Sequence, residues 1–187
     1  IGWSLAAAIV LIVSAMVFEH NRSNPLLNTR WLSSGSILRL GLIMVLIRIV
    51  LAEQNTGVIG WLQYVGLQNE QMTTLAWSIF AGITCGIIAS CLTLNPARLY
   101  WPIATALTLI MVASLLDSQS TSLTRPDQLM LSQFLLGFGS AFFLAPAMIA
   151  GIGGVIADQR NLVSFSVLFG MSQNIGGLMG SAILGTF

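Results

Sequence analysis

Residues 128–156 read QLMLSQFLLGFGSAFFLAPAMIAGIGGVI, a stretch without one charged side chain. An α-helix needs about 20 apolar residues to cross a bilayer, so this stretch is long enough to span one. Similar apolar runs cover about 2–18, 33–52, 72–94, 99–116 and 162–187. Charged residues make up 7% of the chain, against about 25% in soluble domains. The sequence therefore predicts an all-α membrane protein with about six transmembrane spans.

The first run, 1–18, has no basic segment before it and no small-residue cleavage site after it. We therefore interpret it as a truncated span and not as a signal peptide. Because the chain begins at Ile1 and ends at Phe187 inside an apolar run, we expect it to be part of a longer protein of transporter size. We divide it into 1–30, a truncated span with a cytoplasmic linker, and 31–187, an incomplete transmembrane bundle.

The placement of arginine predicts the orientation, because cytoplasmic turns are enriched in cations. Alternate turns carry Arg22, Arg30, Arg98 and Arg160, and we assign these turns to the cytoplasm. The other connections carry Glu70, which has no cation near it, and Arg125, which lies between two aspartates. We expect these connections outside. The alternation holds for all five connections and supports the number of spans.

Small residues recur at helix spacing in three of the runs. Glycines four apart lie on one helix face and allow two backbones to approach closely. We expect helix packing at Gly82, Gly86, Gly137, Gly139, Gly176 and Gly180. Pro146 lies near the middle of the fifth run, where a proline kinks a helix.

The last third of the chain resembles a known transporter family. The segments are QFLLGFG at 133–139, LAP at 144–146, DQR at 158–160 and QNIGGLMGSAIL at 173–184, with FE at 18–19 and PLL at 25–27 upstream. This pattern resembles the 14-span drug:proton antiporters of the major facilitator superfamily, the EmrB-type exporters. The resemblance implies a major facilitator fold in which 31–187 belongs to the C-terminal bundle. It also implies a missing N-terminal half as a partner.

The second run allows two interpretations. Its apolar length alone predicts a helix over about 33–53, with 58–67 as an interfacial segment outside. The family resemblance instead implies one long helix to about residue 65, with a polar break at EQNTG, residues 53–57, inside the membrane. Irregular backbone at that depth is tolerated where it lines a cavity or is buried in protein. We favour the long helix, 31–67, with a break at 55–57.

The long helix would place Arg48 near the middle of the membrane, whereas Arg39 can reach the headgroups from near its end. Arg48 and Glu53 are about 140° apart on an ideal helix, so each is expected to meet a polar group of another helix. We take Glu53 as the proton-coupling residue, since a carboxylate withdrawn from water is costly to keep charged. Candidate substrate-binding residues are Arg48, Gln54, Asn55, Gln173 and Asn174. For Gln173 and Asn174, helix–helix hydrogen bonding is an equal alternative. Asp117, Asp127 and Asp158 lie at the boundaries of apolar runs, where solvated or capping roles are expected.

We expect proton-coupled export of small molecules, drugs or metabolites, by alternating access in the bacterial inner membrane. The alternatives are a major facilitator importer of an organic anion, with Arg48 as its anchor, and a non-transporting membrane subunit. The chain has a single histidine and no Cys/His cluster or nucleophile motif, so we expect no enzyme activity, metal or cofactor. The expected partners are lipid, a small-molecule substrate and protons. A net charge of +1 gives no indication of nucleic acid.

Overall fold

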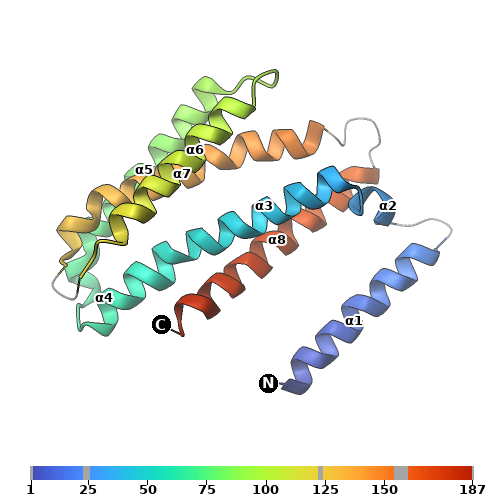
Figure 1. Cartoon of the computed structure of the whole chain (residues 1–187), viewed down its shortest axis with the longest axis horizontal. Helices are drawn as coiled ribbons and strands as arrows, with labels where there is room; N and C mark the ends of the chain where they lie inside the picture. The colour runs from blue at the N-terminus through green and yellow to red at the C-terminus, as the bar shows by residue number, and fades with distance from the viewer. Residues whose placement is uncertain (1, 23–25, 122–123, 154–159, 187) are drawn as a thin grey trace.

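The computed structural model describes the chain except residues 1, 23–25, 122–123, 154–159 and 187, and the described residues form helices and no strand (Figure 1). The elements are α1 (Gly2–Asn21), α2 (Thr29–Leu32), α3 (Gly35–Ala52), the π-helix η1 (Glu53–Ile59), α4 (Gly60–Tyr64), the 3-10 helix η2 (Asn69–Met72), α5 (Thr73–Thr93), α6 (Tyr100–Asp117), α7 (Pro126–Gly153) and α8 (Arg160–Leu184). The predicted domain boundary between residues 30 and 31 falls inside α2.

Within the described residues, five helices are long and apolar enough to cross a membrane. They are Gly35–Tyr64, Asn69–Thr93, Tyr100–Asp117, Pro126–Gly153 and Asn161–Leu184. The predicted span over 1–18 lies in α1, whose described apolar part, Val10–Asn21, is shorter than a span. The prediction of an all-helical protein is confirmed for the described residues. Five of their helices could cross a membrane, where about six spans were expected.

Helix α7 is the centre of the bundle. It packs against α5 and α6 on one side and contacts α3 on another, while α3 pairs with α8 (Figure 1). The central apolar cluster joins Ile47 of α3, Ala106 of α6, and Phe142 and Phe143 of α7. Helix α1 lies apart from the others in Figure 1, and large apolar side chains described on it, such as Trp3 at 93% exposed and Leu11 at 69%, are exposed.

The helix ends fall into two groups along the long axis of the bundle (Figure 1). The start of α3, the α5–α6 turn, the end of α7 and the start of α8 lie at one end. The α4–η2 turn, the end of α6, the start of α7 and the end of α8 lie at the other. This grouping agrees with the alternation expected from the arginines, with Arg98 and Arg125 at opposite ends.

Glycines set the distance between α5 and α7. A Cβ atom added to Gly82 would collide with the backbone carbonyl of Phe134, and one added to Gly86 would lie 2.5 Å from the Phe138 carbonyl oxygen. From the other helix, a Cβ on Gly137 would lie 3.0 Å from the Ile79 carbonyl oxygen. The two backbones therefore approach so closely that only glycine fits at these positions.

Glycines also allow α3 and α8 to approach closely. A Cβ on Gly176 would lie 2.7 Å from the Cβ of Arg48, and one on Gly180 would lie 2.5 Å from the Cβ of Ala52. Gly139, on α7, faces α6, because its Cβ would lie 2.9 Å from Ile110. All six glycines that the spacing selects lie at helix–helix contacts.

Pro146 is buried inside α7, which continues through it as one α-helix.

The second predicted run is one long helical segment, Gly35–Tyr64, so the short alternative that ends near Glu53 is wrong. It begins at Gly35 and not at 31, because Ser33 and Ser34 separate it from α2. The expected break at 55–57 takes the form of η1, a seven-residue π-helix, and the chain is not unwound. The segment EQNTGVI contains β-branched and glycine residues of low helix propensity, which lowers the cost of leaving the α-helix.

Replacing Gly82 with alanine should destabilise the bundle, because the added methyl group meets the Phe134 backbone. Overpacking of this kind costs about 1–3 kcal/mol of unfolding free energy. Gly170→Ala on α8 is the matched control, since nothing lies within 4 Å of its added Cβ and alanine favours a helix. Equilibrium unfolding of the purified protein in detergent measures both, and equal effects would contradict the close α5–α7 contact.

Single cysteines at positions 98 and 125 should react with an impermeant thiol reagent from opposite faces of sealed vesicles. The background protein needs Cys85→Ser and Cys91→Ser, because both native cysteines are free and exposed. Labelling of both positions from the same face would overturn the alternation of the helices.

Candidate functional site

Two acidic side chains from different helices share one hollow of about 310 Å³, which we name the acidic hollow. It is lined by Glu53, Gly57, Val58, Trp61, Asp117, Ser120, Thr121 and Leu129. These residues come from η1 and α4, the end of α6, the loop after α6, and the start of α7. Because Ser120 and Thr121 are exposed loop residues, the hollow opens at the end of the bundle that we expect outside.

Asp117 is held by two side chains of α7. The Ser132 hydroxyl donates a hydrogen bond to its Oδ1, and the Gln133 amide donates to its Oδ2 at 2.8 Å. Ser132 and Gln133 are 3% and 0% exposed, and Asp117 itself is half-buried. The prediction of a solvated or capping role for Asp117 misses these two partners on α7. The short α6–α7 connection returns α7 alongside α6, which brings its first turns to the Asp117 carboxylate.

Glu53 enters the acidic hollow from the first position of η1. Its carboxyl group interacts with the Asp117 carboxyl and with the Gln133 side chain. One of its oxygens, Oε2, is enclosed and has no hydrogen-bond donor, and the same is true of the Gln133 oxygen Oε1. The site thus contains two enclosed acceptors without donors. A proton or another small cation would supply what these oxygens lack.

The polar side chains of η1 bridge to two neighbouring helices. Gln54 is buried, and its Nε2 donates to the Gln133 carbonyl oxygen of α7 at 3.2 Å. The hydroxyls of Thr56 and Ser181, on α8, are 3.1 Å apart. Gln54 therefore has a structural partner and does not line the acidic hollow. The side chain of Asn55 lies outside the described residues.

Arg48 belongs to a different face of the same helix. Its Nε lies 3.5 Å from the position that a Cβ on Gly177 would occupy, so the guanidinium lies against α8. Gln173, on α8, is half-buried, and Asn174 is exposed. The predicted set thus divides in two, with Glu53 and Gln54 turned to α6 and α7, and Arg48 turned to α8. The 140° separation on the helix is the physical reason.

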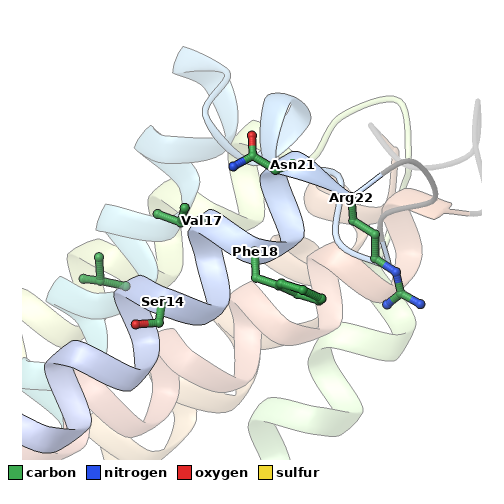
Figure 2. Close-up of a pocket in the computed structure, with 6 residues that line it drawn as sticks. Ser14, Val17, Phe18, Asn21 and Arg22 are labelled. Carbon is green, nitrogen blue, oxygen red and sulfur yellow. The ribbon is translucent and has the colours of Figure 1, made fainter.

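Helix α1 carries another concave region, of about 560 Å³, and Figure 2 shows how its side chains lie. It is lined by Val13, Ser14, Val17, Phe18, Asn21 and Arg22. All six residues come from α1 or the residue that follows it, and no second helix contributes a polar group. This hollow brings no separate functional groups together, so the acidic hollow is the better candidate.

Signals for the missed residue Asp117 exist in the sequence. Asp117 ends one apolar run, and Ser132 and Gln133 lie about two turns into the next, where a polar pair interrupts an otherwise apolar helix. In an antiparallel helix pair these positions are neighbours. Among the described residues, no three His, Cys, Asp or Glu side chains gather as a metal site would require.

Comparisons with models of known protein families, with curated protein sequences and with solved structures find no match to this chain. The functional argument therefore depends on the chain's own residues and their geometry.

Replacing Gln133 with methionine should lower the unfolding free energy by about 1–3 kcal/mol, because Asp117 then loses a buried donor. Methionine has a similar length and leaves the Gln54 bond to the residue 133 backbone in place. Gln119→Met is the control, since Gln119 is exposed in the turn after α6. If chemical denaturation gives the same loss for both variants, the Gln133–Asp117 bond contributes nothing.

Proposed function

We propose that this chain is part of a proton-coupled secondary transporter that exports small molecules by alternating access across a bacterial inner membrane. The observation that carries the proposal is the acidic hollow, where Glu53 and Asp117 meet among membrane-spanning helices. Glu53 lies within the Gly35–Tyr64 span, and Asp117 is the last residue of the α6 span, at the end where the hollow opens. Carboxyl groups within membrane spans are rare because they are costly, and they mark ion pathways and proton relays.

The acidic hollow has the parts that a proton site needs. Two carboxylates close together repel each other when both are charged, so a proton bound between them relieves the repulsion. The enclosed oxygens of Glu53 and Gln133 that lack donors are natural acceptors for that proton. The opening beside Ser120 and Thr121 gives it a route from the side that we expect outside.

Movement of the bundle would expose the proton to the other side. Alternating access in secondary transporters is rocking of one helix bundle against another around a central site. The described helices would be most of a C-terminal bundle, as the resemblance to 14-span drug:proton antiporters implies, and the other half of the transporter would complete the site. A π-helix in the middle of a span is found frequently at functional sites, and η1 lies beside the acidic hollow.

An importer of an organic anion is the second candidate. The observation that favours it is Arg48, whose Nε is enclosed without a partner in the middle of a span. The direction of transport separates the two candidates. A protein that folds but moves neither protons nor solutes would instead be a non-transporting membrane subunit.

Sealed vesicles that hold a pH gradient test the proposal on the full-length protein. Proton movement is recorded with a trapped pH-sensitive dye after addition of ethidium, chloramphenicol or benzenesulfonate, which are cationic, neutral and anionic. We expect at least one compound to discharge the gradient only in vesicles that contain the protein. No discharge by any of them, with correctly folded protein, would contradict proton-coupled transport of these classes.

Glu53→Gln and Asp117→Asn should each reduce that discharge to the level of empty vesicles, because an amide keeps the shape but carries no exchangeable acid proton. Exchange of labelled for unlabelled substrate without a gradient, which needs no net proton movement, should survive better. Glu70→Gln is the control, because Glu70 is exposed in η2 outside the acidic hollow. Normal discharge by Glu53→Gln would exclude Glu53 as the coupling residue.

A further inference from the structure

Arg48 is a cation in the middle of a span. At 1.5 Å per residue it lies about 20 Å from the start of the Gly35–Tyr64 helix and about 24 Å from its end. An arginine at such a depth costs roughly 2.5–3.5 kcal/mol on insertion scales, and from there it reaches headgroups only at a cost. Glu53 is the acid nearest to Arg48 along the helix, but its side chain lies in the acidic hollow beside Asp117. Among the residues that the structure describes, no carboxylate therefore pairs with Arg48.

Two glycines of α8 form a flat surface under this arginine. At Gly176 the Arg48 stem approaches so closely that an added Cβ would lie 2.7 Å from the arginine Cβ. At Gly177 an added Cβ would lie 3.5 Å from Nε and 3.8 Å from Nη2. The guanidinium thus lies along the surface of α8, in the space that a side chain at position 177 would otherwise occupy. Of its nitrogens, only Nε is fully enclosed without a partner.

Polar side chains flank the guanidinium on α8. Gln173 precedes Gly177 by four residues and Asn174 precedes it by three, so both lie one turn away near the same face. Gln173 is half-buried and Asn174 is exposed, so this part of the α3–α8 pair is open to a ligand. One turn after Asn174, Leu178 is 73% exposed and forms an apolar margin. The charged fork, the two amides and this apolar margin therefore lie along one side of α8.

We infer that Arg48, Gln173 and Asn174 form a binding site for the anionic head of an amphipathic organic molecule, with a carboxylate or a group of the same charge. The planar fork of arginine fits two oxygens of such a head, and the amide NH2 groups can donate to it. The apolar margin takes the rest of the molecule. The statement that this ligand is the transported substrate rests on the proposed function, whereas the binding site itself does not.

The site is separate from the acidic hollow. Arg48 faces α8 and Glu53 faces α6 and α7, so the anion and the proton occupy different faces of one helix. The π-helix η1 begins at Glu53, five residues after Arg48, and is hydrogen-bonded through Gln54 to α7 and through Thr56 to α8. The segment that carries Glu53 therefore contacts both neighbouring helices.

A binding measurement on the purified full-length protein tests the inference without any transport step. The probes are benzoate, benzamide and benzamidine, which share a ring and differ in charge. Thermal unfolding in detergent is followed while each probe is titrated. We expect benzoate to raise the unfolding midpoint in a saturable way, and the neutral and cationic probes to leave it unchanged. Equal shifts for all three probes, or no shift with benzoate, would overturn the site.

Variants locate the binding. Arg48→Gln should weaken the affinity for benzoate by at least about tenfold, which corresponds to about 1.4 kcal/mol. Arg39→Gln should not, because Arg39 is an exposed arginine of the same helix, away from Gly177. Gly177→Leu keeps Arg48 but covers its guanidinium, and it should also abolish the benzoate shift. If Arg48→Gln does not fold, Gly177→Leu alone decides, and a normal benzoate shift in it would refute the site.

The failures can be told apart. If benzoate binds through Arg48 but no compound discharges a pH gradient, the anion site stands and the transport proposal fails. If ethidium discharges the gradient while benzoate does not bind, the transporter stands and its substrate is not an anion at Arg48.

Discussion

A charged side chain inside a membrane span is costly unless it meets a polar group, because the hydrocarbon core offers it none. The Gly35–Tyr64 helix carries two such side chains in its central part, and the bundle gives each a different surrounding. Glu53 meets Asp117, and through it the buried amide of Gln133. Arg48 meets the glycine surface of α8 and keeps an unpartnered nitrogen. The arrangement of the bundle and its candidate functions follow from this separation of charges.

The glycine contacts make the separation geometrically feasible. Without side chains at Gly176 and Gly180, α8 approaches α3 closely enough to lie under the Arg48 stem. On the other side, Gly82 and Gly137 bring α5 against α7, and this fixes where α7 presents Ser132 and Gln133. Small residues thus replace the hydrophobic effect, which does not drive helices together in lipid. Hydrogen bonds such as those of Gln54 to α7 and of Thr56 to α8 then fix the register of helices that pack through small residues.

The sequence was sufficient for features that depend on local pattern. Glycine spacing predicted the helix contacts, and apolar length predicted five of the expected spans, although by itself it ended the second run near residue 53. The 140° angle predicted that Arg48 and Glu53 do not pair with each other. Glu53 meets polar groups of other helices as expected, whereas among the described residues Arg48 has no hydrogen-bond partner for its Nε. The partner of Glu53 was not predictable from these patterns, because Asp117 and Gln133 become its neighbours only through the return of α7 beside α6. The same applies to η1, since a polar interruption predicts an irregular helix but does not distinguish an unwound break from a π-helix.

Cross-linking of paired cysteines tests the central claim, that one helix turns its acid and its base to different neighbours. In a protein without native cysteines, a short thiol-specific cross-linker should join position 53 to position 117, and position 48 to position 177. It should not join position 48 to position 117. A 48–117 product formed as readily as the 53–117 product would show that Arg48 and Glu53 share a face, and it would contradict the account.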